Sequence, residues 1–174
     1  MKIISGGQTG VDRAALDVAI ERDVPWGGWC PKGGWAEDFP DPPGLLSKYP
    51  RLKETPLPHP LQRTEWNVRD SDATLIITDG EGIAVSVGTS RGHEWARQHG
   101  KAHLVIDATD PSAPARAALW VKAQRQRYGA DMTLSVGGPR ESEAPGIYMR
   151  ARRLMMAMLD HCQEPRRQAR RRPR

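Results

Sequence analysis

Short apolar runs alternate along this chain with segments of helical periodicity. Strands of about five residues are predicted at residues 2–5, 25–30, 73–78, 103–107 and 132–136. Strands that alternate with helices are typical of an α/β fold with a mostly parallel sheet flanked by helices. A chain of 174 residues, 38% of them apolar, has room for one globular domain.

Helices are predicted between these strands, at residues 9–22, 61–70 and 144–161. A further helix follows a glycine-rich loop at residues 79–92 and continues to His99. Another begins at Asp110, with Asp110 as the N-cap and Pro111 in the first turn. The last helix carries an apolar stripe that we interpret as core or as a subunit contact; its members are Ile147, Ala151, Leu154, Met155, Met158 and Leu159.

The segment from residue 36 to 62 is rich in proline, with seven prolines between Pro40 and Pro60. Proline fixes the backbone and lacks an N–H group, so the segment is predicted to be extended or polyproline-like. Loops of this length are uncommon in compact domains unless they cover a site. The segment is therefore predicted to be a lid and wall over a pocket, or an arm in an oligomer.

The positive charge of the chain is concentrated at one end. Six arginines and one glutamate in residues 163–174 account for the whole net charge of +5. Residues 1–162 are therefore predicted to be a neutral globular domain, and residues 163–174 a disordered basic tail. Contact with nucleic acid or another polyanion is expected only through this tail.

The sequence shows no signal for a membrane or for secretion. No apolar stretch approaches the roughly 18 residues of a membrane span, and no signal-peptide pattern precedes the first strand. The two cysteines, Cys30 and Cys162, are too isolated to suggest a disulfide framework. No spacing of cysteine and histidine matches a known metal site, so we expect no metal ligands. A reduced, cytoplasmic protein is predicted.

Glycines and polar residues follow the first strand, at the point where a helix begins. Because the carboxyl ends of parallel strands share one edge of a sheet, loops in this position converge on a common crevice. Backbone N–H groups at such a helix start can hold phosphate. The first loop therefore contributes the candidate ligand residues Gly6, Gly7, Gln8, Thr9, Gly10 and Arg13.

Two residues of this first loop have alternative interpretations. Thr9 can instead form a capping box with Asp12, and Arg13 can instead make a surface salt bridge. The loop also lacks the third glycine of the dinucleotide fingerprint and the Gly-Lys-Ser/Thr of a P-loop. It therefore indicates an anion without identifying which one.

Three later segments bring further candidates to the same edge. Lys32 follows the second strand and suits a phosphate; Trp29 and Trp35 beside it could stack on a ring or pack against the proline-rich segment. The later loops add Gly88, Thr89, Ser90 and Arg140. Together these residues predict a phosphorylated small molecule as the ligand. The alternative is that the glycines merely end strands.

The helix at residues 61–70 has a polar face that includes Arg63 and Asn67. Trp66 and Asp70 fall on the same face at helical spacing. A face of this kind beside a crevice favours the wall of a binding site. The alternative is a buried network of salt bridges.

Four motifs of the chain together resemble the putative molybdenum carrier family. They lie at residues 6–17, at 28–33 with 36–38, at 63–74, and at 138–142 with 145–148, and the resemblance covers about residues 3–160. This family is a branch of the SLOG group of Rossmann-like proteins, which also includes the LOG nucleotide hydrolases. The resemblance implies a single Rossmann-like domain that forms a homo-oligomer and binds a nucleotide or a molybdenum-cofactor-like ligand at the glycine loops.

The third loop departs from the pattern of the related hydrolases. LOG-type hydrolases have Pro-Gly-Gly-x-Gly-Thr-x-x-Glu, whereas residues 87–94 lack the leading Pro-Gly-Gly and space Glu94 differently. A carrier or sensor that binds its ligand without chemistry is therefore the favoured function. The alternative is a nucleotide N-glycosidase or phosphoribohydrolase, for which Glu94, Asp12 or Asp79 would supply the carboxylate.

Overall fold

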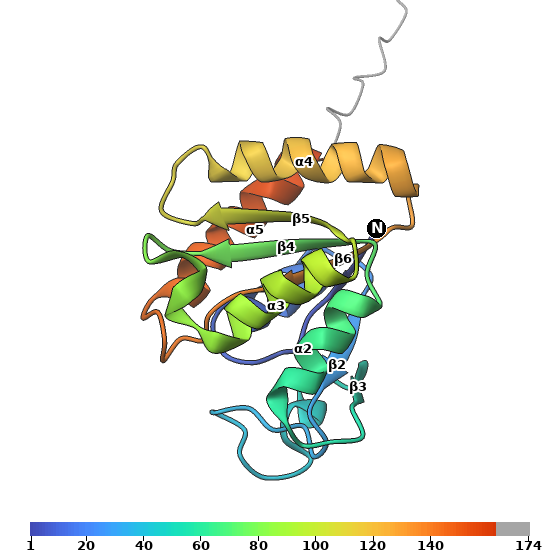
Figure 1. Cartoon of the computed structure of the whole chain (residues 1–174), viewed down its shortest axis with the longest axis vertical. Coiled ribbons are helices and arrows are strands. Elements are labelled where there is room, and N and C mark those ends of the chain that lie inside the picture. The colour runs from blue at the N-terminus through green and yellow to red at the C-terminus, as the bar shows by residue number, and fades with distance from the viewer. Residues whose placement is uncertain (163–174) are drawn as a thin grey trace, which may run out of the picture.

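Six parallel strands form one sheet in the order β3-β2-β1-β6-β4-β5 (Figure 1). The structure is a computed structural model that describes residues 1–162. The strands are β1 (Lys2–Ile4), β2 (Trp26–Cys30), β3 (Leu52–Glu54), β4 (Ala73–Thr78), β5 (Ala102–Asp107) and β6 (Thr133–Gly137). All neighbouring strands pair in parallel, which confirms the α/β fold expected from the alternation of strands and helices.

Helices cover both faces of this sheet. They are α1 (Val11–Glu21), α2 (Pro60–Arg69), α3 (Val87–Gln98), α4 (Ala113–Tyr128) and α5 (Ile147–Cys162), with short 3₁₀ helices η1 (Gly44–Ser47) and η2 (Gly82–Val85). Helices α1, α4 and α5 pack together on one face of the sheet. Helices α2 and α3 lie side by side on the other face, in front of the sheet in Figure 1. The result is a Rossmann-like arrangement of three layers.

The main hydrophobic core lies between the sheet and the layer of α1, α4 and α5. Leu75 and Ile77 of β4 and Leu134 of β6 point into it because alternate residues of a strand face the same side. The apolar stripe of α5 is buried there, including Met155 and Met158. The interpretation of this stripe as core is confirmed.

The proline-rich segment is more ordered than its composition predicted. It contains η1 and the edge strand β3, so the expectation of a wholly extended or polyproline-like chain was wrong. Leu45, Tyr49 and Leu52 are buried in a second apolar cluster that includes Leu16 of α1, and the Tyr49 hydroxyl donates to Asp17 at 2.6 Å. The segment can form η1 and β3 because the stretches 44–47 and 52–54 contain no proline. The buried contacts then hold these elements against α1.

Helix α1 begins later than its sequence pattern suggested. Its N-cap is Gly10, with no side-chain cap, so the Thr9–Asp12 capping box does not form. Thr9 instead donates to Glu37, and Asp12 accepts from Arg63. Long-range partners have replaced the local ones.

Helices α3 and α4 also differ from the prediction at their starts. Helix α3 begins at Val87, so Gly88 and Gly92 belong to the helix rather than to the preceding loop, and Ser86 is the N-cap. The predicted N-cap of α4, Asp110, accepts from the backbone and hydroxyl of Ser112, and the helix begins only at Ala113.

Two further predictions concern membrane-spanning helices and the C-terminal tail. Among residues 1–162, no helix combines the length and apolarity needed to cross a membrane. The predicted disorder of the tail and its contact with polyanions fall on residues 163–174, which lie outside the described residues.

Candidate functional site

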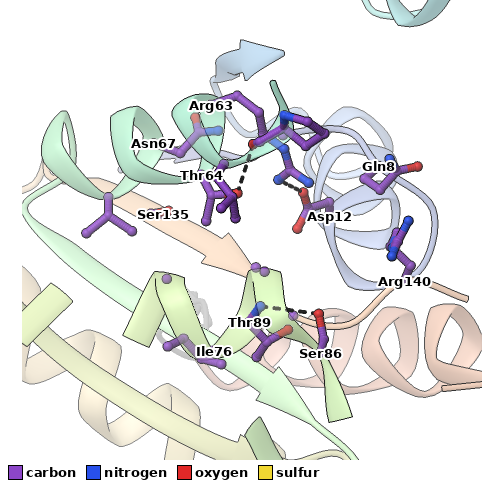
Figure 2. Close-up of a pocket in the computed structure, with 18 of the residues that line it drawn as sticks. Gln8, Asp12, Arg63, Thr64, Asn67, Ile76, Ser86, Thr89, Ser135 and Arg140 are labelled. Carbon is purple, nitrogen blue, oxygen red and sulfur yellow. Dashed lines mark hydrogen bonds and ion pairs between the residues drawn. The ribbon is translucent and has the colours of Figure 1, made fainter. Parts of the chain in front are cut away.

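A cavity of about 350 Å³ lies between the two-helix layer and the sheet. Helices α2 and α3 form its sides, strands β4 and β6 its floor, and the glycine loop after β1 closes one end. Figure 2 shows Arg63, Thr64 and Asn67 on α2 across the cavity from Ser86 and Thr89 at the start of α3. The volume is sufficient for a small organic ligand.

The start of α3 faces this cavity. Ser86 caps the helix by accepting the Thr89 N–H at 3.3 Å. The first-turn N–H groups of Val87 and Gly88 have no partner inside the helix. A Cβ at Gly88 would contact only Ser86 Oγ, at 3.7 Å, so the space beside this turn is open. Such a helix end attracts negative charge through its free N–H groups and its dipole.

Thr89 adds an unusual feature to the same helix turn. Its side chain is buried, and its hydroxyl has no hydrogen-bond partner among the described residues. Buried hydroxyls in folded proteins are nearly always bonded, because an unbonded one loses its water without compensation. The Thr89 hydroxyl is therefore available to a ligand in the cavity.

An ion pair between Arg63 of α2 and Asp12 of α1 forms the wall beside the glycine loop. The Asp12 side chain is 4% exposed, and the Gly138 N–H also donates to it. Burial raises the pKa of Asp12, and the Arg63 guanidinium opposes that increase. A Cβ on Gly6 would overlap Arg63 Nη1 and lie 2.7 Å from Asp12 Oδ2. Glycine at this position therefore leaves room for the pair.

Gln8 and Arg140 also line the cavity. Gln8 Oε1 accepts from the backbone N–H groups of Thr9 and Glu37, each at 3.0 Å. Arg140 pairs with Glu143 at 2.9 Å and approaches Glu37 to 3.6 Å. These contacts connect Glu37 of the proline-rich segment to two residues that line the cavity.

Seven of the thirteen candidate ligand residues line the cavity: Gly6, Gln8, Arg63, Asn67, Gly88, Thr89 and Arg140. Asn67 lines it with its polar atoms already in use, since its amide accepts from the Trp29 N–H at 2.9 Å and donates to the Trp29 carbonyl at 3.0 Å. Its role is to hold α2 against β2. The polar face of α2 is therefore in part the wall of a cavity and in part a set of side chains paired within the fold, so both interpretations of this face apply in part.

The other six candidates do not line the cavity: Gly7, Thr9, Gly10, Arg13, Lys32 and Ser90. Arg13 is buried and donates twice to Asp38, at 2.7 and 2.8 Å, and once to the Gly7 carbonyl. It therefore makes the salt bridge of the second interpretation, although its guanidinium is buried and only the partner carboxylate is exposed. The Ser90 hydroxyl donates to the Ile83 carbonyl at 2.8 Å, and Lys32 is exposed.

The three carboxylates considered for catalysis lie in different surroundings. Glu94 is exposed and pairs with Arg91 at 2.7 Å, and Asp79 accepts from the Glu81 N–H at 3.2 Å. Neither lines the cavity, whereas Asp12 does. Glu143 lines it too and was missed by sequence reasoning, because its pairing with Arg140 is not apparent from a motif.

Further lining residues were missed within the strands. Thr74 of β4 and Ser135 of β6 face the cavity. Their signal in the sequence was a hydroxyl inside an otherwise apolar run. Of the two tryptophans considered for stacking, Trp35 lines the cavity, and the ring of Trp29 packs edge-on against Trp66 with centroids 4.7 Å apart.

No group of three or more His, Cys, Asp or Glu side chains that could hold a metal ion occurs within residues 1–162. His93 and His103 pack edge-on, with ring centroids 5.1 Å apart, and burial lowers the pKa of His93. Burial raises the pKa of the Cys30 thiol to about 11, which disfavours the thiolate form that acts as nucleophile or metal ligand.

Comparison with known proteins gave two matches. The model of the circularly permutated YpsA SLOG family matches residues 3–159. The crystal structure of a protein from Syntrophus aciditrophicus SB, described as a putative molybdenum carrier protein, is similar at 40% sequence identity and a TM-score of 0.77. The alignment covers 91% of this chain and 94% of that one. No curated protein matches the chain significantly.

Proposed function

The chain belongs to the circularly permutated YpsA SLOG family, and on that premise we propose that it binds a phosphorylated small molecule in the cavity between α2 and α3. The phosphate would lie at the start of α3, against the N–H groups of Val87 and Gly88. The protein would act as a carrier or sensor, in keeping with the description of the similar Syntrophus protein as a putative molybdenum carrier protein.

The observation that carries this proposal is the Thr89 hydroxyl. It is buried in the first turn of α3, lines the cavity and lacks a partner among residues 1–162. A phosphate oxygen beside this turn would accept from the hydroxyl and from the free N–H groups together. The ligand would thus satisfy groups that the fold leaves unsatisfied.

The charges of the lining favour a single phosphate group. Arg63 is paired with Asp12 and Arg140 with Glu143, so the two arginines of the lining are already neutralised by two carboxylates. The remaining attraction for an anion comes from the helix start, equivalent to about half a unit charge. That suits one phosphate on an organic body, whether a nucleotide or a molybdenum-cofactor-like pterin.

Thermal denaturation with added ligand tests the proposal. We expect orthophosphate and AMP to raise the melting temperature, because a ligand that binds only the folded state stabilises it. Thr89→Val should remove this effect without lowering the stability of the ligand-free protein, since the lost hydroxyl has no partner. Gly88→Val should also remove it by filling the space beside the helix start.

Ser90→Ala is the matched control. The Ser90 hydroxyl lies one residue further along the helix and bonds to a carbonyl outside the cavity lining. The control should lose some stability and keep the response to ligand. If Thr89→Val responds to orthophosphate and AMP as the unchanged protein does, the phosphate does not bind at α3.

The identity of the natural ligand requires a separate measurement. Native mass spectrometry of gently purified protein, together with elemental analysis for molybdenum, would detect a ligand that remains bound. A bound mass with phosphorus and molybdenum would favour the cofactor-like ligand, and a nucleotide mass without molybdenum would favour a nucleotide sensor.

Oligomeric assembly and cytoplasmic location are further parts of the proposal. They rest on the family resemblance and on the reduced state expected for Cys30 and Cys162. Light scattering after size-exclusion chromatography would test the assembly. We expect a mass that is a multiple of the 19.3 kDa of one chain; a mass of one chain would contradict a homo-oligomer.

A further inference from the structure

Two hydroxyl residues form the floor of the cavity. They lie within their strands, away from the carboxyl ends where the glycine-bearing loops begin. Thr74 of β4 and Ser135 of β6 are direct partners in the parallel register. Both are buried and both line the cavity; Ser135 is labelled in Figure 2. We use the name hydroxyl floor for this pair.

Packing does not account for the hydroxyl floor. The neighbours of these residues on the opposite face of the same strands, Ala73, Leu75, Leu134 and Val136, belong to the main hydrophobic core. The centre of a sheet covered by helices on both faces normally carries apolar residues on both faces. Here α2 and α3 enclose a cavity over hydroxyls where an apolar layer would otherwise lie.

Thr74 is unsatisfied in the same way as Thr89. The residue is 2% exposed, and its hydroxyl has no hydrogen-bond partner among residues 1–162. A hydroxyl left unbonded in the interior costs about 1–3 kcal/mol relative to a bonded one. Replacing this threonine by valine would remove that cost without changing the shape of the floor.

The surroundings of the hydroxyl floor are uncharged or already paired. Val68 and Ile76 are apolar, the Thr64 hydroxyl donates to the Pro60 carbonyl, and the Asn67 amide is bound to the backbone of Trp29. An anion buried at the floor would therefore lack a free counter-charge. A neutral group with hydrogen-bonding atoms would find apolar walls and two hydroxyls.

We infer that the hydroxyl floor determines ligand specificity by hydrogen-bonding the uncharged, polar body of a phosphate monoester, such as a sugar or a heterocycle. This inference rests on the proposed phosphate site at the start of α3. It names the ligand class as an organic phosphate and excludes a free oxyanion as the preferred ligand. Thr74 and Ser135 are specificity-determining residues that act on the part of the ligand remote from its phosphate.

Isothermal titration of the full chain tests the inference with AMP, GMP, ribose 5-phosphate, riboflavin 5′-phosphate and orthophosphate as probes. We expect at least one ester to bind more tightly than orthophosphate. Thr74→Val should weaken the tightest ester about tenfold, equivalent to about 1.4 kcal/mol, and leave orthophosphate unaffected. Ser135→Ala should weaken the same ester, again without an effect on orthophosphate.

Thr78→Val is the matched control for Thr74→Val. Thr78 lies on the same face of β4 and is also buried, but its hydroxyl donates to the Ile106 carbonyl at 3.3 Å and it does not line the cavity. The control should lower the melting temperature and leave all affinities unchanged. Thr74→Val should keep or raise the melting temperature of the ligand-free protein.

The outcomes separate this inference from the proposed function. If orthophosphate binds and no ester binds more tightly, or if Thr74→Val leaves the ester affinity unchanged, the inference is wrong and the phosphate site at α3 stands. If Thr74→Val destabilises the ligand-free protein as much as Thr78→Val, the hydroxyl is bonded within the fold and the inference also fails. If no probe binds, both fail.

Discussion

Arg63 of α2 and the buried carboxylate of Asp12 on α1 form an ion pair across the side-chain-free face of Gly6. The two residues are 51 positions apart in the sequence. Their pairing joins the two helix layers at the end of the sheet where the glycine loop lies. It also removes most of the charge from that wall of the cavity.

Gly6→Ala should displace this ion pair. The added Cβ would overlap Arg63 Nη1 and crowd Asp12 Oδ2. The guanidinium must therefore move away from Asp12 and leave that part of the cavity wall open to solvent. We expect a lower melting temperature and about a tenfold loss of AMP or orthophosphate affinity, whichever binds more tightly, equivalent to about 1.4 kcal/mol. Gly80→Ala is the control, because a Cβ there has no neighbour within 4 Å. Equal stability of the two variants would show that Arg63 adjusts without cost.

Removing Arg63 should make stability depend more strongly on pH. Burial raises the pKa of Asp12 in the folded protein and Arg63 opposes that effect, so Arg63→Met should raise this pKa further. A carboxyl whose pKa is higher in the folded state binds more protons there, and stability falls as pH increases through that range. We expect a loss of about 3–5 kcal/mol near neutral pH, with partial recovery on acidification.

The double variant Arg63→Met, Asp12→Asn isolates the cause of this dependence. It lacks the titrating carboxyl and should show a smaller loss with no recovery at acidic pH. Urea denaturation over a pH series measures both variants. A single variant that loses the same stability at every pH would contradict a raised pKa for Asp12.

The Arg13–Asp38 pair predicts the opposite dependence. Hydrogen bonds from Arg13 lower the pKa of Asp38 below 3.8, so its stabilising contribution is complete above that value and is lost as pH falls through the lower, folded-state pKa. Asp38→Asn should cost about 1 kcal/mol at neutral pH, a modest value because solvent screens the 42% exposed carboxylate. Urea denaturation of both proteins should show this difference shrinking below about pH 4, and AMP binding should not change.

Glu94→Gln should have no effect on ligand binding. Glu94 is exposed, pairs with Arg91 and does not line the cavity. Incubation with nucleoside monophosphates and NAD-type dinucleotides, followed by chromatography of released base, should show little or no turnover. Release near about 1 per second that Glu94→Gln abolishes would overturn the carrier function in favour of the hydrolase.

Local patterns were sufficient to predict most of the fold. The alternation of strands and helices predicted the parallel sheet, and the stripe of α5 predicted its buried face, because both periods are set by local backbone geometry. Helix starts were less accurate. Asp110 and Thr9 are good caps by residue type, but their side chains bond to Ser112 and Glu37 instead.

The sequence by itself determined five of the six strands, the helices and the convergence of glycine-bearing loops at one edge of the sheet, since these follow from short-range patterns and the chirality of parallel crossovers. Only the tertiary structure decided which polar side chains face the cavity. Arg13 forms an ion pair with Asp38, whereas Thr74 and Ser135 lie at paired positions of the neighbouring strands β4 and β6. Such pairings depend on contacts between distant segments, and no local period encodes whether a buried polar group finds its partner within the fold.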